Sequence, residues 1–210
     1  MIIICIPYYD AIDSRTLDCV EALLKSNIDC NVRRDESGSI GYRGTYIGNQ
    51  RNLLIHNMTS SRIDQKLPEG ETHYLFLDSS NTIGTTEVER LLNHDLDIVS
   101  AAYTPRGNRN YYCAGNAVYK DGLLKKEYIP ATTTGLIEVD IVGAGALLVK
   151  REVFEKLEYP WFRHEWVRFE MDGIKYQAQT GEDIGFCLLA KANGYKIYVD
   201  CDCISEHYHD

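Results

Sequence analysis

Clusters of positive charge are missing from this chain of 210 residues, which carries 22 Lys and Arg against 31 Asp and Glu and has a formal net charge of −9. Proteins that bind nucleic acid draw affinity from clustered Lys and Arg, so this composition argues against a general nucleic-acid partner. An acidic protein that binds a phosphorylated ligand needs a local source of positive charge. A divalent cation held by carboxylates is the simplest such source.

Long hydrophobic runs are also missing, and the apolar stretches are far too short to cross a bilayer, so we expect no transmembrane segment. Residues 1–6 lack the basic start and the cleavage site of a signal peptide. The seven Cys are odd in number and irregular in spacing, which indicates buried thiols and no disulfide framework. These absences predict a protein of a reducing compartment, the cytoplasm.

Internal repeats and low-complexity tracts are absent, so the chain fits one large domain with its own core. The dinucleotide fingerprint and the P-loop are absent too. Gly38, Gly41 and Gly44 are spaced by three, and no Gly-Lys-Ser/Thr follows them. This argues against a Rossmann dehydrogenase. Potential ligands crowd residues 200–210 and end abruptly, which suggests one domain, the N-terminal one, of a longer protein.

What the sequence does contain is an alternation of strands and helices over residues 1–103, the signature of an α/β fold with a mostly parallel sheet flanked by helices. The expected strands are 2–6, 28–32, 74–77 and 97–103. The first expected helix is capped by Asp13 or Ser14 and carries Leu17, Val20, Leu23 and Leu24 at helical spacing. Two further helices are expected at 47–58 and at 85–93, the second capped by Thr85 or Thr86.

The alternation fails at residues 104–140, where turn residues and tyrosines favour a small antiparallel excursion or a functional loop. Aromatic and polar residues in alternation also suit a sugar-binding surface, and a plain β-excursion fits equally well. The remaining expected elements are, in chain order, a strand at 141–149, a short helix at 151–157, an aromatic loop from Tyr159, a helix from Thr180 to Gly194 and a strand at 196–199.

The stretch Tyr74–Leu77 is apolar and stops at Asp78, which is followed by small polar residues. A buried parallel strand ends in this way where it opens into a ligand crevice. An Asp at a strand end often only caps the next helix, so this motif is weak when taken alone.

The motifs taken together resemble those of nucleotide-sugar glycosyltransferases with the GT-A fold, particularly the inverting family-two type, over nearly the whole chain. The resemblance is carried, in chain order, by Ile4–Tyr9, Arg51-Asn52, Phe76–Ser80, Val142–Gly145, Gly181–Asp183 with Gly194-Tyr195, and Tyr198–His207. The chain is also similar to small GT-A domains encoded by large DNA viruses such as the chlorella viruses, which implies the cytoplasm of a host cell. The family's arrangement implies a nucleotide-binding half, 1–103, and an acceptor and catalytic half, 104–210.

The resemblance implies a UDP-sugar donor and a glycan or glycoprotein acceptor. By this resemblance Tyr9 stacks on the base and Asp35 accepts the imide proton of uracil. The other nucleotide contacts that it implies are Pro7, Arg51, Asn52, Asp78 and Ser79. The sugar and acceptor contacts are Gly143, Ala144, Gly145 and Trp161. In an inverting reaction one carboxylate takes the proton of the acceptor hydroxyl. The resemblance assigns this role to Asp183, with Glu182 as second choice, and retention stays open.

The chain departs from the family at Ser80, which stands where the second Asp of the Asp-x-Asp motif is expected. A hydroxyl is a poorer ligand of Mn²⁺ or Mg²⁺ than a carboxylate, so the ion is expected to rely on Asp78, Ser80, His207, the donor diphosphate and waters. Oxygen and imidazole ligands together favour Mn²⁺. We expect weak metal binding without the donor.

Two other readings fit parts of the sequence. Cys201, Cys203, His207 and His209 are zinc-type ligands, although their spacing is unusual for a structural zinc site. Ser80 is also compatible with a catalytically silent domain that binds a sugar nucleotide.

Overall fold

The computed structural model describes residues 1–7, 11–34, 47–56 and 66–208. Tyr9 and Asp35, both expected to contact the nucleotide base, and His209 of the zinc alternative lie outside these residues.

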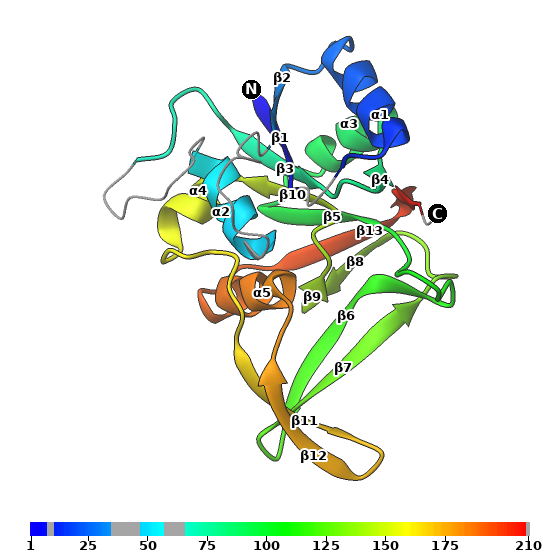
Figure 1. The fold of residues 1–210 in the computed structure, drawn as a ribbon, viewed down its shortest axis with the longest axis vertical. Helices are drawn as coiled ribbons and strands as arrows, with labels where there is room; N and C mark the ends of the chain where they lie inside the picture. Colours follow the sequence, from blue (N-terminus) through cyan, green and yellow to red (C-terminus); the bar gives the residue numbers. More distant parts are fainter. Residues whose placement is uncertain (8–10, 35–46, 57–65, 209–210) are drawn as a thin grey trace.

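A seven-stranded sheet forms the centre of the fold, in the order β2-β1-β3-β10-β5-β13-β8 (Figure 1). Its strands are β1 (Ile2–Ile6), β2 (Cys30–Arg34), β3 (His73–Leu77), β5 (Ile98–Ala102), β8 (Leu136–Val139), β10 (Ala146–Lys150) and β13 (Ile197–Ile204). Five strands run in one direction, whereas β10 and β8 run antiparallel to their neighbours. The predicted α/β class is confirmed in this coarse form, and β10 in the middle makes the sheet mixed.

Helices cover both faces of this sheet (Figure 1). One face packs against α1 (Ser14–Leu24) and α3 (Thr85–Asn93), and the other against α2 (Ile47–His56), α4 (Arg151–Lys156) and α5 (Glu182–Ala192). Successive side chains of a strand point to opposite faces. In β1, Ile3 and Cys5 therefore pack with the second group of helices, while Ile4 packs with the first. The continuous apolar run in β1 follows from this double burial.

Local sequence signals explain some element boundaries and miss others. Asp13 caps α1 as predicted, because its side chain accepts a hydrogen bond from the Arg15 backbone N–H at 2.8 Å. The expected caps Thr85 and Thr86 lie inside α3, whose N-cap is Gly84. The single strand expected at 141–149 is two strands, β9 (Ile141–Val142) and β10, which belong to different sheets.

Two hairpins extend from the body of the molecule (Figure 1). Strands β6 (Tyr111–Lys120) and β7 (Leu123–Pro130) form a three-stranded sheet with β9, and thus realise the expected antiparallel excursion. Strands β11 (Trp166–Met171) and β12 (Ile174–Gln179) form a ribbon where the sequence indicated an aromatic loop. Short strands β4 (Asn81–Thr82) and β14 (Glu206–His207) pair near the end of β3. Within the described residues, no helix has the length and apolar character needed to span a membrane.

Asn52 ties the loop after α4 to helix α2. Its side-chain amide donates to the Phe162 carbonyl at 2.9 Å and accepts from the Phe162 N–H at 2.9 Å, and all these atoms are buried. We expect Asn52→Ala to lower the free energy of unfolding in urea by about 2–3 kcal/mol, because two buried backbone groups lose their partner. Asn49→Ala on the exposed side of the same helix should change it by less than about 0.5 kcal/mol. Equal effects of the two changes would contradict the anchoring role.

Candidate functional site

Arg51 lies at the centre of the candidate site, where α2 and α5 meet the end of β3. Its side chain is 2% exposed, and each terminal nitrogen bonds a carboxylate: Nη2 lies 2.5 Å from Asp78 Oδ1, and Nη1 contacts Glu182 Oε1. Gly48 permits the close approach of α5, because a Cβ at that position would lie 2.8 Å from the Glu182 Cβ. Three segments that are far apart in the sequence are therefore joined by one buried guanidinium group.

The charge of Arg51 is maintained by its surroundings. Burial alone would lower the pKa of Arg51, but the carboxylates of Asp78, Glu182 and Asp183 outweigh this effect and raise it. The guanidinium also lies 5.6 Å from the centroid of the Phe162 ring, a favourable cation–π distance. Arg51 was expected to contact the nucleotide, and in the described residues its two terminal nitrogens contact carboxylates.

Asp183 follows Glu182 in the first turn of α5 and is half-buried. One of its carboxylate oxygens accepts a hydrogen bond from the Ile184 N–H at 2.7 Å. Burial, followed by the negative charge of Glu182, raises the pKa of Asp183 to about 6, while the nearby charge of Arg51 acts in the opposite direction. A carboxyl group with a pKa near the working pH is well suited to act as a general base.

Tyr103 follows β5 directly and packs against Gly143 and Gly145. Its hydroxyl oxygen accepts a hydrogen bond from the Gly145 N–H at 3.0 Å. A Cβ at Gly143 would lie 2.0 Å from this oxygen, and a Cβ at Gly145 would lie 2.8 Å from the ring carbon that carries it. Both glycines are thus required by the packing of Tyr103. Ala144 between them is buried, and Gly143 also lines a pocket.

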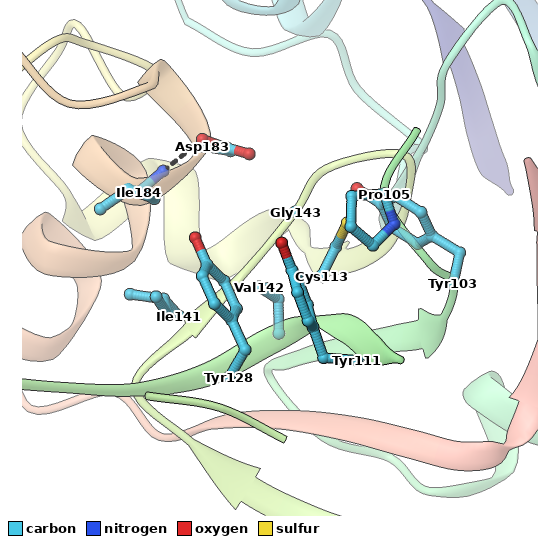
Figure 2. A pocket seen from close by; sticks show the side chains of 10 residues that line it. All are labelled: Tyr103, Pro105, Tyr111, Cys113, Tyr128, Ile141, Val142, Gly143, Asp183 and Ile184. Atoms are coloured by element: carbon cyan, nitrogen blue, oxygen red, sulfur yellow. Dashed lines mark hydrogen bonds between the residues drawn. The ribbon is translucent and has the colours of Figure 1, made fainter. Parts of the chain in front are cut away.

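This pocket has a volume of about 140 Å³ and opens beside Asp183 (Figure 2). Its lining residues come from β6, β7, β9, α5 and the segment after β5, and they are Tyr103, Pro105, Tyr111, Cys113, Tyr128, Ile141, Val142, Gly143, Asp183 and Ile184. The rings of Tyr111 and Tyr128 are stacked with their centroids 5.0 Å apart. Figure 2 shows their hydroxyl ends directed to the side on which Asp183 lies. The pocket thus combines hydroxyl groups, aliphatic walls and one carboxyl group.

The segment after β13 lies next to the turn that follows Asp78. His207 pairs with Asn81 across β14 and β4, and the Tyr208 N–H donates to the Ser80 carbonyl at 2.9 Å. His207 Nδ1 lies 3.2 Å from the Thr104 carbonyl oxygen. A carbonyl only accepts, so Nδ1 carries the proton and the neutral ring has its lone pair on Nε2, the usual arrangement of a metal-binding His.

These donor types fit a hard divalent cation only in part. A carboxylate, a hydroxyl and an imidazole nitrogen match the preferences of Mn²⁺. However, no group of three or more His, Cys, Asp or Glu that could hold a metal occurs within the described ranges. Asp78 and His207 therefore offer an incomplete set, and a cation here would need further ligands from a substrate or water.

The side chains of two residues expected to bind ligands, Asn52 and Trp161, have partners within the protein. Asn52 is saturated by the Phe162 backbone. Trp161 is 4% exposed, donates to the Leu157 carbonyl and stacks on His56, so we do not retain it as a sugar contact. The Ser79 carbonyl accepts from the Asp13 N–H at 2.9 Å, while its side chain is half-buried. Pro7 is buried at the end of β1, beside residues that the structure does not describe.

The zinc alternative is not supported by the positions of its cysteines. Cys201 packs in the core on one face of the sheet, whereas Cys203 packs on the opposite face. A register shift in β13 between Asp200 and Ile204 separates them in this way. Burial raises the pKa of Cys201 to about 11 and that of Cys203 to about 12, in agreement with their positions in the core.

Pocket residues that the sequence analysis did not single out are Tyr103, Pro105, Tyr111, Cys113, Tyr128, Ile141 and Ile184. The tyrosines had a signal in the sequence, since they are concentrated in the antiparallel excursion that was compared with a sugar-binding surface. Pro105, Cys113 and the two isoleucines carry no signal of this kind.

We compared the sequence and the structure of this chain with those of known proteins. No family model and no curated protein matches the sequence. Among solved structures, A197 from STIV matches with a TM-score of 0.59 and 19% identity, covering 100% of this chain and 86% of that one. GalNAc-T7, crystallised with UDP, GalNAc and Mn²⁺, matches with a TM-score of 0.58 and 13% identity. Residues 1–349 of S. aureus TarS match with a TM-score of 0.52 and 12% identity.

The chain has a GT-A-like fold. It is covered to 100% by the match to GalNAc-T7 and to 98% by the match to TarS, but it spans only 44% and 60% of those two chains. Both neighbours are glycosyltransferases. At these identities the likeness establishes the GT-A-like fold and not the reaction.

We expect Arg51→Met to lower the free energy of unfolding in urea by about 3–5 kcal/mol, because Asp78 and Glu182 would lose the cation that neutralises them. Arg163→Met is a matched control, since the Arg163–Glu165 pair is about one-third exposed and should contribute less than about 1 kcal/mol. The double change Arg51→Met with Glu182→Gln should cost less than Arg51→Met alone. A larger loss in the double variant would contradict the proposed charge balance.

Proposed function

We propose that this protein is a metal-dependent glycosyltransferase that moves a hexose-type sugar from a UDP-sugar to a hydroxyl of a glycan or glycoprotein, with inversion. The observation that carries the proposal is Asp183, a carboxyl group with a raised pKa that lines an open pocket beside the carboxylates linked by Arg51. The GT-A-like fold supports this choice, as does a neighbour crystallised with UDP, GalNAc and Mn²⁺.

In the proposed reaction the oxygen of the acceptor hydroxyl forms a bond to the anomeric carbon of the donor sugar. The bond from that carbon to the diphosphate oxygen breaks, and UDP leaves with the electron pair. Asp183 takes the proton of the attacking hydroxyl. Arg51 does not touch the substrate in this scheme, because both its terminal nitrogens hold carboxylates. It is a positioning residue that keeps Glu182, and with it the first turn of α5, in place.

Asp78 and His207 are the residues that we propose to hold the cation, with Ser80 as a weaker third ligand. A bound Mn²⁺ or Mg²⁺ supplies positive charge that stabilises the leaving diphosphate. The nucleotide itself is proposed to lie near Pro7, Ser79 and Asp78, with Tyr9 and Asp35 at the base.

Catalysis is tested by Asp183→Asn with a panel of UDP-sugars and glycan acceptors in the presence of Mn²⁺. We expect kcat to fall by about 100-fold or more, because the base is lost, while Glu158→Gln on the exposed surface leaves kcat unchanged. For the native protein, kcat should rise about tenfold per pH unit below pH 6 and level off above it, since Asp183 must be ionised. A flat profile from pH 5 to 8 would argue against this base.

Loss of folding would not explain a loss of activity in Asp183→Asn. The pKa of Asp183 is higher in the folded protein than its ordinary value, so the stabilising protonated form is lost as the pH rises through about 6. At pH 7.5 the neutral Asn should therefore give an equal or higher melting temperature. A lower melting temperature would show that the carboxylate has a structural role.

The metal assignment is tested by the shift in melting temperature that UDP produces with and without Mn²⁺. A ligand that binds only the native state raises its melting temperature. We expect a large shift for UDP with Mn²⁺ and a small one for either alone. Ser80→Asp should increase the Mn²⁺-dependent part of the shift, because a carboxylate is a better ligand than a hydroxyl. An unchanged shift in both Ser80→Asp and His207→Ala would remove these residues from the metal site.

The second candidate function is a domain that binds a sugar nucleotide without transferring it, and Ser80 in place of a carboxylate is the observation that favours it. This function predicts the same UDP-dependent thermal shift, but with no difference in turnover between the native protein and Asp183→Asn.

A further inference from the structure

The pocket beside Asp183 is about the size of one six-membered ring. Its volume is about 140 Å³, and an apolar protein cavity of about 150 Å³ accommodates benzene. The pocket is partly open to solvent, so a ring that fills it can continue outward as part of a longer molecule. One sugar unit is therefore the natural size of ligand.

The charges of the lining select against acids. Asp183 is the one ionisable group of the ten lining residues that is negative at neutral pH, and none of these ten is Lys, Arg or His. A uronic acid or a sugar phosphate would bring a second negative charge close to Asp183 without a cation from this lining to balance it, and such an arrangement is costly in a half-buried site.

The polar groups of the lining suit hydroxyls. Burial raises the pKa of Tyr128, so its phenol keeps its proton at neutral pH and can donate a hydrogen bond. Asp183 is the strongest acceptor. A neutral sugar presents hydroxyls that both donate and accept, and it can therefore satisfy both kinds of group.

One end of the pocket is aliphatic. Figure 2 shows Ile141 and Ile184 beside the ring of Tyr128, away from Tyr103 and Pro105 at the opposite end. A hydroxyl or hydroxymethyl group directed between the two isoleucines would lose water and gain no hydrogen bond from them, which is unfavourable. A methyl group directed there would gain from leaving water.

We infer that this pocket is a subsite for an uncharged pyranose unit whose substituent ends in a methyl group, and that the methyl group lies between Ile141 and Ile184. The identification of this unit as the acceptor rests on the proposed function, because it uses Asp183 as the base. A methyl group of this kind occurs in an acetamido group or at C6 of a 6-deoxy sugar.

The test compares dissociation constants of four methyl glycosides that share one frame: glucose, N-acetylglucosamine, 6-deoxyglucose and glucuronic acid, each as both anomers. Titration by NMR at pH 7.5, without nucleotide, measures them directly. We expect at least one of the two methyl-bearing sugars to bind about tenfold more tightly than glucose, because one buried methyl group discriminates by this order. Which of the two does so distinguishes the acetamido from the 6-deoxy source. Glucuronic acid should bind more weakly than glucose.

Substitutions in the pocket distinguish binding at this subsite from non-specific binding of sugars. Ile184→Thr should reduce the preference for the methyl-bearing sugar about fivefold or more, with little change in the affinity for glucose. Tyr128→Phe keeps the ring but should weaken all neutral sugars alike. Ile174→Thr, at an exposed position of the β11–β12 ribbon, is the matched control and should change nothing. If Ile184→Thr lowers the melting temperature strongly, the conservative Ile141→Val serves as the second variant.

Any of three results would overturn the inference. Glucose and both methyl-bearing sugars could bind equally, or glucuronic acid could bind as tightly as glucose. The third such result is an unaltered preference in both Ile184→Thr and Ile141→Val. The proposed function fails separately. If the preference for a methyl group is found but no UDP-sugar is turned over, the subsite stands and the transferase does not. If sugar is transferred to an acidic acceptor in preference to a neutral one, the transferase stands and this subsite is refuted.

Discussion

One buried guanidinium group determines how the candidate site is built. Arg51 is 2% exposed and bonded to Asp78 at the end of β3 and to Glu182 at the start of α5. Removing a charge of this kind from water is unfavourable unless its partners are well placed, so the positions of α2, β3 and α5 are linked to one another. Asp183 is adjacent to Glu182 but has no such bond to Arg51, and the charge of Glu182 acts with burial to raise its pKa to about 6. The ion pairs of Arg51 thus hold α2, β3 and α5 together and leave the carboxyl group of Asp183 at the pocket with a raised pKa.

Tyr103 has a comparable role at the pocket. Its ring packs against Gly143 and Gly145, where any side chain would collide with it, and its hydroxyl receives the Gly145 N–H. The Gly145 carbonyl in turn accepts from the Asp78 N–H at 3.1 Å. The break between β9 and β10 therefore connects Asp78 to the pocket through backbone atoms. This connection gives the small-residue stretch a physical reason that is independent of any sugar.

Periodicity and strand-end chemistry predicted most of the first half of the fold, because β1, α1, β3 and α3 each bury a regular apolar face that is visible in the sequence. The same reasoning failed for β10. A strand that is apolar on both faces looks the same whether it runs parallel or antiparallel, and its insertion between β3 and β5 depends on tertiary pairing. The β11–β12 ribbon was missed because most of its side chains are exposed, which weakens the alternation of buried and polar residues. For the site, Asp78 was singled out by its position at the end of an apolar strand, whereas Asp183 and Glu182 were assigned by the resemblance. Asn52 and Trp161 were assigned to ligands by resemblance, whereas their actual partners are distant backbone groups or rings that no local pattern reveals.

The charges of the site bear on the order in which its proposed ligands bind. With all groups ionised, Asp78, Glu182 and Asp183 contribute three negative charges and Arg51 one positive charge, a balance of −2. A diphosphate alone would be repelled by this balance, and a divalent cation alone would find only an incomplete set of ligands in Asp78, Ser80 and His207. When the two bind together, each supplies what the other lacks: the cation offsets the charge, and the phosphate oxygens complete the coordination shell. A second carboxylate at position 80 would strengthen the cation's binding without the nucleotide and so weaken this mutual dependence. Ser80 is consequently compatible with a site in which metal and nucleotide binding are strongly coupled, and its presence is not by itself an argument against catalysis.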